Sequence, residues 1–191
     1  MVEVALIGWL VYVLVAFVLR TVVQLRTTGS SGFVGLRRNA GAIERLAGAA
    51  MLASFALSLI APFVGEPLAD TAGLGGATIA LATAGTFAAQ LTMASSWRIG
   101  VDERERTELV TGGMFAIVRN PIFSLMVLAS IGFALACPTP LALLAPPLLA
   151  LGLALQVRLV EEPYLARTHG DAYREYARRV GRFLPWIGRL C

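Results

Sequence analysis

The sequence predicts an all-α integral membrane protein with about five transmembrane helices, and three observations lead to this fold class. Of 191 residues, 57% are hydrophobic and only 15% are charged, whereas a soluble domain carries about 25% charged residues. The apolar residues fall in runs of roughly 17 to 24, the length that crosses a hydrocarbon core. The arginines gather in the stretches that separate these runs. We therefore expect residues 1–191 to form a single membrane domain.

The apolar runs and the residues that end them give the expected helices. Spanning helices are predicted at residues 4–19, 46–61, 72–95, 115–137 and 141–160. Only Pro138-Thr139-Pro140 separates the last two, so they are expected to form a tight antiparallel hairpin. Pro146 and Pro147 predict a kink in the fifth helix. An amphipathic helix is expected at residues 172–180, on the membrane surface, because its aromatic and basic residues lie on opposite faces.

The charge distribution predicts how the chain is oriented. All sixteen basic residues are arginines, and they lie in residues 20–45, 98–119 and 158–189. The positive-inside rule places these three zones in the cytoplasm, and residues 62–71, which are acidic and lack arginine, outside. We therefore expect a multi-pass protein of the cell membrane, and the lysine-free composition favours a bacterial inner membrane. Anionic lipids account for the basicity, so membrane lipids and no nucleic acid are the expected partners.

Two polar clusters, at residues 109–123 and 158–185, lie where the fourth helix enters and the fifth helix leaves the membrane. Gly112 and Gly113 permit close approach of the backbone to a ligand. Arg119 and Asn120 lie just inside a span, where unpaired polar groups are costly. The hairpin should bring both clusters together. No set of His and Cys residues has metal-ligand spacing, so no metal is expected.

The two clusters resemble a known family. The matching segments are Leu109-Val110-Thr111-Gly112-Gly113-Met114-Phe115, Arg119-Asn120-Pro121, Glu161-Glu162, Gly170-Asp171-Ala172-Tyr173-Arg174-Glu175-Tyr176 and Arg179-Val180. In order and spacing they are similar to the isoprenylcysteine carboxyl methyltransferase family and the related membrane phospholipid methyltransferases. The resemblance covers roughly residues 97–186. It implies that this region binds S-adenosylmethionine and methylates a lipophilic small molecule or prenylated substrate, with the active site facing the cytoplasm.

The resemblance also implies which residues bind the cofactor. They are Leu109, Val110, Phe115, Asn120, Pro121, Phe123 and Glu161. Three of them depart from the family pattern, since Asn120 replaces the usual His, and Phe115 and Phe123 replace the usual Tyr residues. Asparagine cannot titrate, which argues against an acid or base at that position.

Arg158 is the expected catalytic residue, because a guanidinium at the end of the fifth helix can orient an anionic acceptor by a charge-assisted bond. Methyl transfer from a sulfonium needs mainly positioning and desolvation. A structural alternative pairs Arg158 with Glu161 and Glu162 at a helix end. A second alternative has Arg119 extending to the membrane interface. His169 is expected to be an exposed turn residue without a role.

Three other functions remain open on the sequence. The first is a phospholipid N-methyltransferase, and the second is an NADPH-dependent membrane reductase of the sterol-reductase type. The third is a non-catalytic membrane scaffold with a degenerate pocket, which the replacement of His by Asn120 keeps open.

Overall fold

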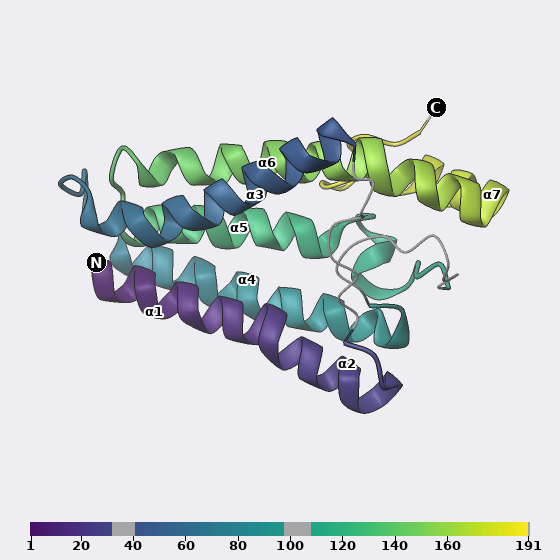
Figure 1. Cartoon of the computed structure of the whole chain (residues 1–191), viewed down its shortest axis with the longest axis horizontal. Coiled ribbons are helices and arrows are strands. Elements are labelled where there is room, and N and C mark those ends of the chain that lie inside the picture. The colour runs from purple at the N-terminus through teal and green to yellow at the C-terminus, as the bar shows by residue number, and fades with distance from the viewer. Residues whose placement is uncertain (32–40, 98–107, 191) are drawn as a thin grey trace.

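The computed structural model describes residues 1–31, 41–97 and 108–190, which form a bundle of long helices (Figure 1). In chain order the elements are α1 (Val2–Val13), η1 (Leu14–Leu19), α2 (Arg20–Thr28), α3 (Ala42–Ile60), η2 (Ala61–Phe63), α4 (Ala72–Thr92), η3 (Ala94–Ser96), η4 (Gly113–Ala116), α5 (Pro121–Ala136), η5 (Ala142–Leu144), α6 (Ala145–Gln156), η6 (Val157–Glu161) and α7 (Glu162–Arg179). Within the described ranges there is no strand, only isolated β-bridges. The all-α class is confirmed.

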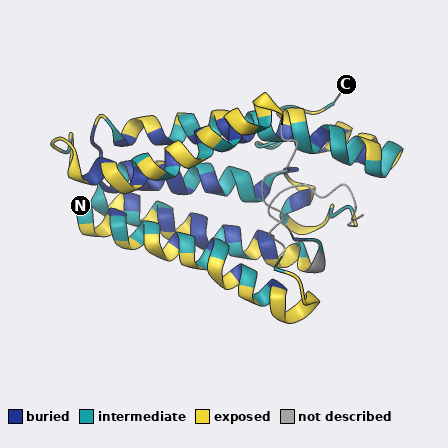
Figure 2. Cartoon of the chain, in the orientation of Figure 1, coloured by how far each residue is buried: buried dark blue, intermediate teal, exposed yellow. Residues whose placement is uncertain are grey.

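The helices have the length and surface of membrane spans. Within the described part of the chain, four stretches are long and apolar enough to cross a membrane: Val2–Thr28, Ala42–Phe63, Ala72–Thr92 and Ala142–Arg179. The remaining expected span, the fourth, is α5, a shorter apolar helix of 16 residues that packs between α4 and α6. Exposed residues lie along the outer faces of the bundle (Figure 2), and many of them are large and apolar. A lipid environment explains this exposure, and the expected multi-pass membrane protein is confirmed.

The first span is longer than expected. A π-helical segment, η1, joins α1 to α2 without a break, so the span runs from Val2 to Thr28 rather than from residue 4 to 19. Arg20 consequently lies inside the helix and is 2% exposed. Its Nη2 donates to the Ala94 carbonyl at 2.6 Å, and its guanidinium lies 4.8 Å from the centre of the Trp97 ring. These contacts let a charged side chain remain buried.

Proline explains two helix boundaries that differ from the prediction. The fourth span begins at Pro121 rather than at residue 115, since a residue before proline avoids the helical conformation, and Asn120 has φ −125° and ψ 60°. Gly113–Ala116 forms a separate 3₁₀ turn. In α6 the two prolines after Ala145 lie in the first turn, where proline is favoured. The predicted kink at Pro146 and Pro147 is therefore wrong.

The irregular part of the last helix lies at its other end. The π-helical segment η6 precedes Pro163 and leads directly into α7. Proline lacks an N–H and clashes with the preceding turn, and a π turn relieves this conflict. The helix after the span thus begins at Glu162 rather than at residue 172. It breaks its regular geometry at Gly170, which has φ 55°.

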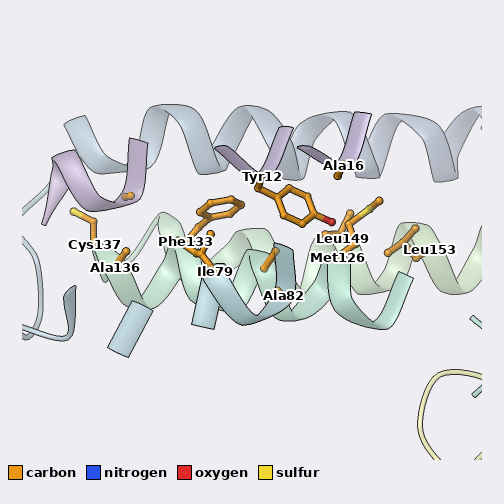
Figure 3. Packing of buried hydrophobic residues seen from close by; sticks show 12 residues of the cluster. Tyr12, Ala16, Ile79, Ala82, Met126, Phe133, Ala136, Cys137, Leu149 and Leu153 are labelled. Atoms are coloured by element: carbon orange, nitrogen blue, oxygen red, sulfur yellow. The ribbon is translucent and has the colours of Figure 1, made fainter. Parts of the chain in front are cut away.

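The core lies between the spans. Tyr12, Phe133 and Leu149 come from α1, α5 and α6 and meet in the middle of the bundle (Figure 3). The Tyr12 and Phe133 rings are 6.1 Å apart and nearly perpendicular, a favourable aromatic geometry. Gly75 of α4 packs directly against the backbone of α5, because small residues let membrane helices approach closely. The closely packed bundle holds the start of α5 and the end of α6 at the same end of the molecule (Figure 1).

Candidate active site

The two polar clusters meet at the end of the bundle where α5 begins and α7 starts. Val118 forms a parallel β-bridge with Gly181. The Arg119 N–H donates to the Gly181 carbonyl at 2.8 Å, and the Asn120 N–H donates to the Arg182 carbonyl at 3.1 Å. The residues before α5 and the segment after α7 are thus paired through their backbones. The expectation that the hairpin brings the two clusters together is confirmed.

The Arg119 side chain makes further contacts between these two parts of the chain. Its guanidinium donates to the carbonyls of Ala177, Val180 and Gly188 and to Oε1 of Glu162, the last at 2.6 Å. The side chain is only 2% exposed. The alternative that Arg119 extends to the membrane interface is therefore wrong. Planar guanidinium groups suit such a role because they offer five donors in a fixed arrangement.

Glu162 is the carboxylate at the centre of the same network. Arg182 donates to it from two nitrogens, Nε to Oε1 at 2.9 Å and Nη2 to Oε2 at 2.8 Å. The hydrogen bonds that Arg182 donates to this carboxylate raise the pKa of its guanidinium above the ordinary value. Arg119, Glu162 and Arg182 form what we call the arginine–glutamate network. The alternative that pairs Glu162 with Arg158 is wrong, because Glu162 forms its salt bridges with Arg119 and Arg182.

Glu161 lies outside this network. It is half-buried at the last position of η6, and its side chain is hydrogen-bonded to that of Gln156, five residues back. That spacing fits a π turn, which joins residues i and i+5. In the described part of the chain, the salt bridges of this region go to its neighbour Glu162 rather than to Glu161. Its carboxylate can therefore still accept hydrogen bonds from a ligand.

The glycine-containing segment is held against α7. The Tyr176 hydroxyl donates to the Phe115 carbonyl at 2.6 Å, and Leu109 packs against the cluster formed by Tyr173, Tyr176, Ala177 and Val180. Gly113 has φ 58°, a left-handed conformation that favours glycine. Its Cα faces Thr92 of α4 so closely that an added Cβ would lie 3.1 Å from the threonine methyl.

The remaining predicted residues fall in three places. Asn120 donates from Nδ2 to the Arg182 carbonyl at 3.1 Å, and Pro121 is buried beside it. Phe123 packs against the main core of the bundle instead. Val110 is half-buried, and Arg158 is exposed on η6. The structure thus brings Leu109, Phe115, Asn120 and Pro121 to the arginine–glutamate network and the α7 residues beside it. Glu161 is next to Glu162 in the chain but contacts Gln156 instead, and Phe123 turns toward the bundle.

Sequence reasoning missed three features of this site. The sequence pattern does not indicate a role for Arg182, and it does not show that Glu162 pairs with Arg119 and Arg182. His169, expected to be exposed, is half-buried, and its Nε2 is buried without a hydrogen-bond partner in the described part of the chain. The signal for the network was the arginine of the motif itself, since a buried arginine inside a span needs hydrogen-bond acceptors such as a carboxylate or backbone carbonyls.

A groove of about 270 Å³ lies next to the site, between the start of α3 and the η6–α7 junction. Glu44 and Arg167 border it together with apolar residues such as Leu159 and Val160. None of the residues expected to hold the cofactor lines this groove, so the groove is separate from the candidate site.

Comparison with known proteins gives two matches. The sequence pattern of the phospholipid methyltransferase family matches residues 71–172, more than half of the chain. The fold is similar to the solved structure of a eukaryotic intramembrane Ras methyltransferase, an isoprenylcysteine carboxyl methyltransferase, with TM-score 0.60 and 19% sequence identity. The alignment covers 91% of this chain and 62% of that one, so the chain spans less than two thirds of that protein. None of the curated proteins compared matches the sequence.

Proposed function

Because the chain belongs to the phospholipid methyltransferase family, we propose that it transfers a methyl group from S-adenosylmethionine to a lipophilic acceptor in the bilayer. One observation carries this proposal. It is the backbone pairing of Val118–Asn120 with Gly181–Arg182, which joins the polar segment before α5 to the segment after α7 at one end of the bundle. A water-soluble cofactor and a membrane-embedded acceptor can meet at such a boundary.

The described residues offer the groups that S-adenosylmethionine requires. Glu161 supplies a half-buried carboxylate that can accept hydrogen bonds from amino or ribose hydroxyl groups. Leu109, packed against α7, and the buried Phe115 would supply apolar surface, which suits an adenine ring. The cofactor supplies an already electrophilic methyl group, so the protein has to bind, orient and exclude water. Arg158, exposed at the end of the span, would hold an anionic group of the acceptor.

The acceptor class follows from the same boundary position. The solved relative favours a prenylated carboxylate, and the family description favours a phospholipid. Both carry an anionic carboxylate or phosphate for which Arg158 is suited. Incubation of the purified protein with radiolabelled S-adenosylmethionine and, separately, a prenylated thiol, an isoprenoid acid and a phospholipid amine tests the proposal. Label in the lipid fraction with one of them is the expected result, and label with none contradicts methyl transfer to these acceptors.

Replacing Glu161 by glutamine is expected to weaken the binding of S-adenosylhomocysteine by about 1 to 3 kcal/mol, the usual cost of losing a charged hydrogen-bond partner. Isothermal titration calorimetry measures the change. Glu175→Gln is the matched control, since Glu175 lies on the exposed face of α7 and its salt bridge among the described residues is with Arg179. Unchanged affinity in a folded Glu161→Gln protein would remove Glu161 from the cofactor site.

Arg158→Ala and Asn120→Ala are expected to have opposite effects. Loss of Arg158 should lower the rate at saturating cofactor by at least about tenfold and leave cofactor affinity nearly unchanged, because this side chain orients the acceptor. Loss of Asn120 should instead weaken cofactor binding, because its amide fixes the Arg182 backbone beside the site. Turnover rates and S-adenosylhomocysteine affinities of both variants check this. Normal turnover by Arg158→Ala would show that its assigned role is wrong.

We also propose that the site faces the cytoplasm of a bacterial inner membrane. A cysteine introduced at residue 66, in the connection after α3, should react with an impermeant maleimide from the periplasmic side. A cysteine at Arg178, on the exposed end of α7, should react only after the membrane is opened. Labelling of residue 66 from the cytoplasmic side alone would reverse the orientation.

A further inference from the structure

The segment after α7 ends in an exposed apolar turn. Leu184, Pro185, Trp186 and Ile187 form this C-terminal turn, and three of its side chains are largely exposed: Leu184 at 57%, Trp186 at 75% and Ile187 at 63%. Charged and polar residues cover most of the surface of α7 nearby. An exposed cluster of large apolar side chains beside such a surface indicates an interaction site.

Backbone hydrogen bonds hold the C-terminal turn in place, with the Trp186 side chain exposed. The Ile187 N–H donates to the Leu184 carbonyl at 3.2 Å, and the Arg182 N–H donates to the Ile187 carbonyl at 2.8 Å. Trp186 has φ 64°, in the left-handed region. A non-glycine residue in this conformation lowers the stability of the fold by about 1 to 2 kcal/mol. The fold therefore maintains an exposed aromatic side chain in a conformation that the isolated chain avoids.

The position of the C-terminal turn relative to the membrane follows from its hydrogen bonds to α5. The Ser124 hydroxyl donates to the Phe183 carbonyl at 2.6 Å, and the Asn120 amide donates to the Arg182 carbonyl. These residues form the first turn of α5, where this apolar helix begins. The C-terminal turn thus lies level with the edge of the apolar bundle, beside the junction of α6 and α7 (Figure 1).

The charges around the C-terminal turn fit a lipid surface. Arg178 and Arg179, in the last turn of α7, are exposed, and Arg189, just after the C-terminal turn, is exposed as well. Basic side chains near a membrane are attracted to anionic headgroups, and tryptophan is enriched where headgroups meet acyl chains. Trp186, Ile187 and Arg189 together match this layered environment.

We propose that the C-terminal turn docks into the boundary between headgroups and acyl chains of the membrane leaflet on the α7 side, with Trp186 and Ile187 among the acyl chains and Arg189 at the phosphates. Arg182 and Arg119 connect both ends of this turn to Glu162. Docking therefore fixes the height of the arginine–glutamate network relative to the bilayer. The proposal rests on the described surface and is independent of the reaction.

Fluorescence quenching in lipid nanodiscs tests the proposal. The signal of Trp186 is obtained by subtracting the emission of Trp186→Phe from that of the unchanged protein, which removes the contributions of Trp9 and Trp97. Lipids brominated near the headgroup end of the acyl chains should quench this difference signal at least about two-fold more strongly than aqueous iodide does. Equal or stronger quenching by iodide would overturn the proposal. Trp186→Tyr provides the same subtraction if the phenylalanine variant does not fold.

Discussion

Arg119→Ala is expected to lower the free energy of unfolding by about 3 to 5 kcal/mol, the usual cost of removing one partner from a buried ion pair. The Glu162 side chain is only 11% exposed, and the change leaves it with a single cationic partner in the network, Arg182. It also removes the donors to three backbone carbonyls that hold the segment after α7. We therefore expect cofactor binding to be lost together with stability. Thermal or urea unfolding of the detergent-solubilised protein measures the effect.

Arg179→Ala is the matched control for this prediction. Arg179 is also an arginine paired with a glutamate, but its side chain is 70% exposed and the N–O distance is 3.6 Å. Exposed pairs of this kind contribute about 0 to 1 kcal/mol. If the two variants lose equal stability, the arginine–glutamate network does not hold the C-terminal segment in place.

Gly75→Ala is expected to lower the free energy of unfolding by about 2 to 3 kcal/mol, because it overpacks the tightest contact between α4 and α5. A Cβ at Gly75 would lie 2.2 Å from the Ala136 nitrogen and 2.7 Å from the Gly132 carbonyl oxygen. Both are backbone atoms, so only a shift of a whole helix can make room. Thermal unfolding in detergent reads out the loss.

The same substitution two residues earlier provides the control. A Cβ at Gly73, also in α4, would have no atom within 4 Å. Gly73→Ala is therefore expected to be neutral or slightly stabilising, as alanine is the better helix former. Equal stability of the two variants would mean that α4 and α5 do not pack as closely as described.

The fold class could be predicted because each spanning helix needs a long run of apolar residues, which can be read directly from the sequence. The runs that predicted the spans correspond to helices α1 to α6, and their approximate order and the hairpin are correct. The ends of helices were less predictable near prolines. Pro121 delays the start of α5, and Pro163 is preceded by a π turn that extends the last span into α7. Such effects depend on how the helix continues, which local patterns do not reveal.

The site was predicted in part for a similar reason. Its two halves could be recognised as polar clusters, but their pairing joins residues far apart in the sequence, such as Arg119 with Glu162. The alternative that pairs Arg158 with Glu162 assumes a regular helix, in which residues four apart share a face. The π-helical segment η6 contains Arg158 and rotates the following residues, so Glu162 meets Arg182 and Arg119 instead.

The central claim is that the site at the α5 and α7 ends binds S-adenosylmethionine, and thermal unfolding with ligands tests it most directly. S-adenosylhomocysteine at one hundred times its dissociation constant should stabilise the detergent-solubilised protein by about 2.7 kcal/mol. NADPH at the same concentration should leave the unfolding temperature unchanged. Stabilisation by NADPH alone would indicate a reductase, and stabilisation by neither ligand would contradict the proposed methyltransferase and favour a non-catalytic membrane protein.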